Sequence, residues 1–134
     1  MTDHARVTIQ RDRPSLPELT IGNEDRMVLR SLAARVAELA ARPIEQHKRE
    51  LWRRLNALQP GRPLILCWPE NSWNEVFPPH ALRCTGELAR RWELTLRMEI
   101  YWGEDLCDDR VIEPFFTVSH VYTDSGWGLH ETRI

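Results

Sequence analysis

The segment Arg62-Pro63-Leu64-Ile65-Leu66-Cys67-Trp68-Pro69 contains the longest purely apolar run of the chain and decides the predicted fold. Five consecutive apolar residues lie between two prolines, and a run this short that is apolar on both faces is typical of a buried strand in a parallel sheet. The run is also far shorter than the roughly 20 residues that a membrane-spanning helix needs. We therefore predict a strand over 64–68 and no membrane span.

Two helices are predicted upstream of this run. Asn23 is a good N-cap, with acidic residues after it in the first turn, and apolar residues then repeat at helical spacing until Pro43 ends the first helix and opens the second. The second helix should bury an apolar face and leave its charged residues solvated. The apolar face holds Ile44, Leu51, Leu55 and Leu58, and the charged residues are Glu45, Lys48, Arg49, Arg53 and Arg54.

A third helix and further strands are predicted downstream. The helix should begin near Ala81 or Thr85 and end near Trp102, because Gly103 follows its apolar stripe. Residues 111–121 and 129–134 have the composition of strands. The expected fold class is therefore α/β (or α+β), with an irregular arm over 1–20 and one domain over 21–134. That domain combines helices with a small sheet that need not be complete.

Composition restricts the class of protein. The 134 residues suffice for one domain, and 42% apolar residues, 28% charged residues and a net charge of −2 indicate a globular chain rather than a disordered one. The charge is segregated, with a net +4 over 1–62 and −6 over 63–134, which favours attraction to a second copy or another partner. The sequence has no basic stripe interleaved with aromatic residues, so it does not predict nucleic-acid binding.

Cysteine usage and the N-terminal sequence bear on the compartment. The three cysteines are widely spaced and contain no CxxC pair, which suits reduced thiols better than a disulfide framework. The first 13 residues are polar and charged and lack the apolar core of a secretory signal. We therefore expect a cytoplasmic protein.

Candidate binding residues lie in loops. Trp68, Trp73 and Trp127 sit in stretches rich in proline or glycine, where a tryptophan can serve a pocket or an interface as well as a core. With arginines such as Arg83, these tryptophans could hold an anionic or aromatic small molecule. Glu75 and His80 could perform acid–base chemistry, but without a nucleophile or an oxyanion site a polar loop is the favoured interpretation.

Metal and nucleotide chemistry have weaker support. His80 and Cys84 are four residues apart and could face one metal ion, yet no second pair has matching spacing, so Cys84 is better interpreted as an ordinary thiol. The acidic residues over 104–109 lack the glycine and the ligand alternation of a calcium loop. Phosphate-binding glycine motifs and the GxSxG motif are absent from the sequence. No catalytic residue and no metal ligand are assigned.

A family resemblance rests on the order of several short motifs. These are LWRRLNAL (51–58), RPLIL (62–66), SWNE (72–75), RRWE (90–93), DDRVIEP (108–114) and SGWG (125–128). Together they make residues 24–134 similar to the N-terminal region of uroporphyrinogen decarboxylase-like proteins. That superfamily includes cobalamin-dependent methyltransferases.

The resemblance implies a TIM-barrel catalytic domain that this chain is too short to contain. A parent protein would be a decarboxylase or a corrinoid-dependent methyltransferase, with zinc or a corrinoid as its cofactor. The chain itself would hold no cofactor and would be inactive alone. It would act by associating with itself or with the missing C-terminal barrel. The alternative is a small stand-alone ligand-binding or dimerisation protein that uses the loop tryptophans and arginines.

Overall fold

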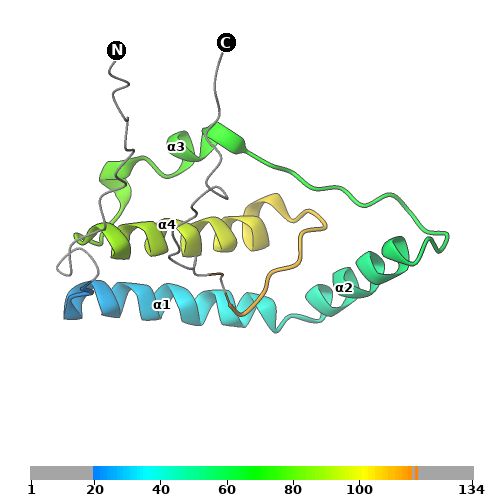
Figure 1. Ribbon diagram of the computed structural model, residues 1–134, viewed down its shortest axis with the longest axis horizontal. Helices are drawn as coiled ribbons and strands as arrows, with labels where there is room; N and C mark the ends of the chain where they lie inside the picture. The colour runs from blue at the N-terminus through cyan, green and yellow to red at the C-terminus, as the bar shows by residue number, and fades with distance from the viewer. Residues whose placement is uncertain (1–19, 116, 118–134) are drawn as a thin grey trace, which may run out of the picture.

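The computed structural model describes residues 20–115 and 117, and its regular elements are helices (Figure 1). The α-helices are α1 (Asn23–Ala40), α2 (Pro43–Asn56), α3 (Trp73–Val76) and α4 (Glu87–Tyr101). Two 3₁₀ turns, Glu70–Ser72 and Pro79–Ala81, flank α3, and α4 continues into a π-helical turn over Trp102–Leu106. The three long predicted helices are therefore present, with bounds close to those expected.

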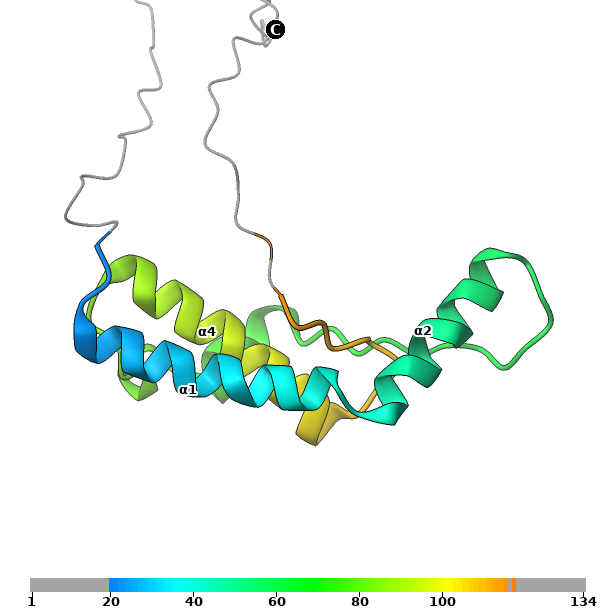
Figure 2. The same cartoon turned by 90° about the horizontal axis from the view of Figure 1, so that it is seen from below.

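The core forms where α1 and α4 lie side by side, as both views show (Figures 1 and 2). Helix α1 contributes Leu29, Val36 and Leu39, and α4 contributes Ala89 and Leu96. The apolar stripe of α1 follows the helical spacing of the sequence, so that its face can be buried along the whole length of the partner helix. This helix pair is the platform on which the remaining segments pack.

The first turn of α1 also fixes the start of α4. The helix begins at Asn23 with Gly22 as its N-cap residue, one position earlier than predicted. Asp25 is buried, and its carboxylate accepts hydrogen bonds from the amides of Thr85 and Gly86, both at 3.0 Å. Gly86 is the N-cap residue of α4, so Asp25 fixes the two residues that lead into this helix.

Helix α2 buries two charged residues and leaves apolar residues exposed, contrary to the prediction. It extends away from the α1–α4 pair (Figure 2), and the two residues that it buries are Glu45 and Lys48. Its apolar residues Ile44 and Leu55 are exposed, as is Leu58 just beyond its end, and Leu51 is half-buried. The prediction that the charged residues are solvated was wrong for Glu45 and Lys48, because ion pairing and backbone hydrogen bonds satisfy both in the interior.

The predicted sheet is contradicted. No residue in the described ranges is a strand, and the segment over 62–68 is an exposed extended stretch that links α2 to α3 (Figure 1). Its backbone is held mainly by side chains: Asp109 accepts from the amide of Ile65 at 2.8 Å, and Asp108 accepts from the amide of Cys67 at 2.7 Å. In a sheet, these amides would donate to the carbonyls of a neighbouring strand, whereas here they donate to carboxylates. The α/β or α+β class is therefore replaced by a helical fold.

The other predicted strands are also absent where the structure describes their residues. Residues 111–115 and 117 contain no strand, and Pro114, which cannot donate to a ladder, lies within them. The rest of the predicted strand over 111–121, the strand over 129–134 and the arm over 1–19 lie outside the described residues.

Candidate functional site

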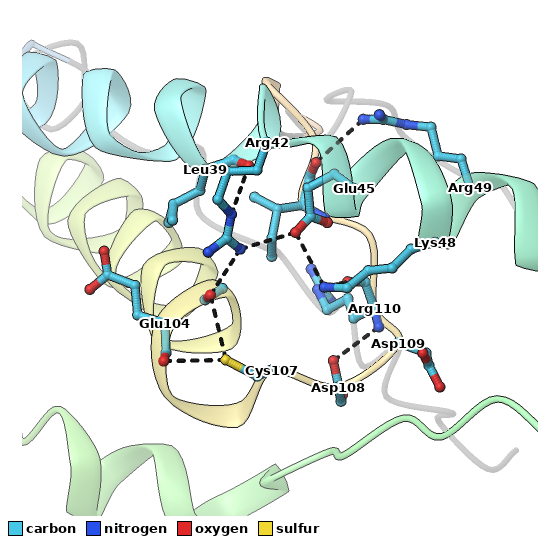
Figure 3. A network of polar contacts seen from close by, with 12 residues as sticks. Leu39, Arg42, Glu45, Lys48, Arg49, Glu104, Cys107, Asp108, Asp109 and Arg110 are labelled. Carbon is cyan, nitrogen blue, oxygen red and sulfur yellow. Dashed lines mark hydrogen bonds and ion pairs between the residues drawn. The ribbon is translucent and has the colours of Figure 1, made fainter.

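A buried ionic network joins α2 to the chain that follows α4 (Figure 3). Glu45 is its centre, with a side chain that is 0% exposed. One carboxylate oxygen accepts from Arg42 at 3.0 Å and from Lys48 at 3.2 Å, and the other accepts from the amide of Ile112 at 2.8 Å. Each oxygen is therefore engaged, and the charge is compensated by two cations.

The cations of this network are satisfied by backbone carbonyls as well. Lys48 donates to the carbonyl of Arg110 at 3.0 Å, and Arg42 donates to the carbonyls of Gly103 at 2.9 Å and Leu39 at 3.3 Å. A site that performs acid–base chemistry needs a group free to meet a substrate. Because these side chains are used internally, the network's role is to fix α2 in place.

Asp109 fastens the extended segment to the same region. Arg62 forms two hydrogen bonds with its carboxylate, at 2.7 and 2.5 Å, and the amide of Asp109 donates to the carbonyl of Ile65 at 2.9 Å. The indole of Trp52 on α2 donates to the carbonyl of Asp109 at 2.7 Å. The Arg62 guanidinium, followed by the amide of Ile65, lowers the pKa of Asp109 to about 2.

Two of the predicted binding tryptophans converge on Trp102. The ring centroids of Trp73 and Trp102 are 4.7 Å apart in an edge-on contact, and those of Trp68 and Trp102 are 5.4 Å apart. The guanidinium carbon of Arg110 lies 3.9 Å from the Trp102 ring centroid, which is a cation–π arrangement. Trp73 is buried in the core, whereas Trp68 is 63% exposed. The cluster is thus packed, with Trp68 at its surface.

The other predicted site residues are dispersed. Glu75, His80 and Arg83 are exposed. Arg83 lines a hollow of about 450 Å³ beside the first turns of α1, together with Glu24, Asp25, Met27, Val28, Ser31 and Thr85. None of the predicted tryptophans lines that hollow, so Arg83 does not share it with Trp68 or Trp73. Trp127 lies outside the described residues.

Cys84 is placed as a structural thiol. It is buried, and burial followed by the neighbouring Glu93 carboxylate raises its pKa to about 12, which disfavours the thiolate that binds metals or attacks substrates. Glu93 accepts from the amides of Arg83 and Cys84 and from Arg97. Burial opposes ionisation of Glu93, but these hydrogen bonds prevail and lower its pKa. Over 20–115 and 117, no three His, Cys, Asp or Glu residues are grouped to hold a metal ion.

The exposed apolar face of α2 is the feature of this region that remains without a partner. Ile44 and Leu55 lie on it, and Leu58, just beyond the end of α2, is 93% exposed. Next to this face is a hollow of about 180 Å³, lined by Leu51 and Leu55 of α2, by Arg54, and by residues at the start of the extended segment: Gln59, Gly61, Arg62 and Pro63. Of the exposed apolar residues, Leu55 borders this hollow, and exposed apolar surface of this kind is typical of an interaction site.

The residues that organise this region were not identified as such from the sequence. A usable signal was the spacing of Arg42, Glu45 and Lys48, which places opposite charges three residues apart along one helix face. Asp109 carried no local signal, because its partner Arg62 is 47 residues away.

Comparison with protein-family models, with curated proteins and with solved structures finds no match to this chain. The family resemblance therefore stays a prediction. Among the described residues, no helix is long and apolar enough to cross a membrane.

Proposed function

We propose that this chain is a non-catalytic docking domain that binds another polypeptide through the apolar face of α2. The observation that carries the proposal is the exposure of apolar residues on that helix: Glu45 and Lys48 are buried, while Ile44 and Leu55 are exposed, as is Leu58 just beyond its end. A helix that is anchored by buried ion pairs and still leaves apolar residues exposed presents a surface that a groove can bury.

The surroundings of the face support binding of a polypeptide rather than a small molecule. Leu51 and Leu55 border the hollow at the end of α2, which is open to the start of the extended segment. Arg53 and Arg54 are exposed at the same end and would lie at the polar rim of an interface. Helix α2 is held by Glu45 and Trp52, so little ordering is required on binding.

The partner that we propose follows from the resemblance to the N-terminal region of uroporphyrinogen decarboxylase-like proteins. The catalytic barrel of such a protein would receive α2, and any zinc or corrinoid would belong to that barrel. The three free cysteines, Cys67, Cys84 and Cys107, support a cytoplasmic location for this assembly.

The test is calorimetric titration of the chain with the purified barrel domain of a uroporphyrinogen decarboxylase-like protein. We expect saturable binding that Leu55→Glu and Leu58→Glu weaken at least tenfold, because each places a charge in the apolar contact. The matched control is Gln46→Glu, which adds a charge at an exposed position on the side of α2 opposite Leu55. Circular dichroism would check that all variants are folded.

Two outcomes would contradict the proposal. One is an absence of binding to the barrel domain by the folded wild-type chain. The other is turnover of a uroporphyrinogen or a methyl-corrinoid substrate by the chain alone, since a docking domain without catalytic residues should be inactive.

A further inference from the structure

The backbone of the extended segment over 62–68 forms hydrogen bonds along one of its two edges. In extended backbone, the N–H and C=O groups of successive residues point to opposite sides. Those of Ile65 and Cys67 point to the body of the protein: Ile65 is bonded to Asp109 in both directions, and Cys67 bonds to the Asp108 carboxylate and the Trp102 indole. These contacts make the odd-numbered positions the inner edge.

The even-numbered positions form an open outer edge. Within the described chain, the amides of Leu64, Leu66 and Trp68 donate no hydrogen bond, and their carbonyls accept none. Pro63 and Pro69 both fall on odd-numbered positions, so neither removes a donor from this outer row. An exposed row of unpaired donors and acceptors is a template for a further strand.

We propose that this outer edge pairs antiparallel with the same segment of a second copy of the chain, with Leu66 opposite Leu66. Leu64, Leu66 and Trp68 do not line the hollow beside α2, although Arg62 and Pro63 of the same segment do, so this contact is additional to the proposed function. In this register Leu64 of one copy lies opposite Trp68 of the other. The two-fold axis passes between the two Leu66 residues, and every outer amide obtains a carbonyl partner.

The side chains of the segment favour pairing with itself. Residues 63–69 carry no charge, so no like charges meet across the axis. Ile65 is 67% exposed and Trp68 is 63% exposed, and neither is protected by the lysines that usually guard an edge strand. A second copy would cover these apolar side chains as well as the backbone.

Charge complementarity favours a second copy over an unrelated strand. Before residues 63–69 lie the exposed Arg54 of α2 and Arg62, which also pairs with Asp109, whereas the exposed Glu70 follows them, as does the exposed Glu75 of α3. Antiparallel pairing about Leu66 places the basic end of one copy beside the acidic end of the other. The arrangement thus uses the opposite charges of the two halves of the sequence.

Disulfide trapping tests the register. In a background with Cys67→Ser and Cys107→Ser, Leu66→Cys should form a disulfide-linked dimer under mild oxidation. Residues directly opposite in a hydrogen-bonded antiparallel pair have Cα atoms about 5.5 Å apart, a distance that a disulfide spans. Leu64→Cys in the same background is the control and should stay largely monomeric. A mixture of the Leu64→Cys and Trp68→Cys chains should form the mixed dimer.

Sedimentation of the full chain tests the association itself. We expect a concentration-dependent dimer in the wild type, at least a tenfold weaker one in Leu66→Lys and in Leu66→Glu, and recovery in a 1:1 mixture of these two folded variants. A wild type that stays monomeric at millimolar concentration would overturn the inference, as would equal trapping at positions 64 and 66. Neither outcome would touch the binding of a barrel domain to α2, which the titration measures separately.

Discussion

At the residue scale, the deciding feature is that Glu45 is charged and completely buried. A buried carboxylate is tolerated only where cations and hydrogen-bond donors replace its hydration. Here Arg42, Lys48 and the amide of Ile112 do so. The spacing of Arg42, Glu45 and Lys48 alone could indicate that these side chains form ion pairs on one helix face. It could not indicate that the pair faces inward, because the amide of Ile112 is 67 residues away.

Removing this carboxylate should be costly, and removing its partner as well should recover part of the loss. We expect Glu45→Leu to lower the free energy of unfolding by about 3–5 kcal/mol, since it leaves the buried Lys48 ammonium without its counter-ion. The double variant Glu45→Leu/Lys48→Met should lose clearly less. Urea denaturation would measure both, with Glu50→Leu on the exposed side of α2 as a control within about 0.5 kcal/mol of wild type. A double variant less stable than the single one would contradict this account.

At the scale of the elements, sequence patterns predicted helices well and the extended segment poorly. Helix signals are local: Pro43 opens α2 and the periodicity of α1 marks its buried face. The apolar run over 64–68 has the composition of a buried strand, but its backbone partners are the side chains of Asp108 and Asp109. Partners so distant in sequence leave no trace in a local pattern, so neither the exposure of the run nor its free edge could be predicted.

The hydrogen bonds that join the first turn of α1 to the start of α4 yield a testable prediction. Asp25 accepts from the amides of Gly86 and Thr85, and these bonds lower its pKa. We expect Asp25→Ala to lower the free energy of unfolding by about 1–2 kcal/mol, because two backbone amides lose their charged acceptor. Glu24→Ala, which removes an exposed acid from the same helical turn, should cost less than about 0.5 kcal/mol. Equal losses in thermal denaturation would show that the effect is one of helix charge and not of the hydrogen bonds to Thr85 and Gly86.

At the scale of the whole molecule, the structure consists of a packed helix pair and a projecting part held to it by ionic contacts. The pair formed by α1 and α4 contributes most of the buried apolar residues. Helix α2 and the extended segment are attached through Glu45, Lys48, Arg62 and Asp109. Both proposed interaction surfaces lie on this projecting part, so a partner could cover them without disturbing the core.

The carboxylates that hold these parts together predict how the free energy of unfolding depends on pH. The pKa values of Asp25, Glu93 and Asp109 are all lowered in the folded state, that of Asp109 to about 2 from an ordinary value of 3.8. A lowered pKa means that the unfolded chain binds more protons, so its stabilising effect is present above about pH 4 and is lost as the pH falls toward 2. We expect the free energy of unfolding, measured in urea, to rise steadily from pH 2 to about pH 4.5.

Asp109→Asn should make this rise shallower while lowering stability at pH 7 by about 2 kcal/mol, because the paired charge–charge hydrogen bonds to Arg62 are replaced by neutral ones. Asp105→Asn, at an exposed position in the neighbouring turn, should leave the slope unchanged. If the two variants have the same slope as wild type, the pairing of Asp109 with Arg62 contributes nothing to acid stability. A shallower slope for Asp109→Asn alone places that contribution at the point where the extended segment is fastened to the helical core.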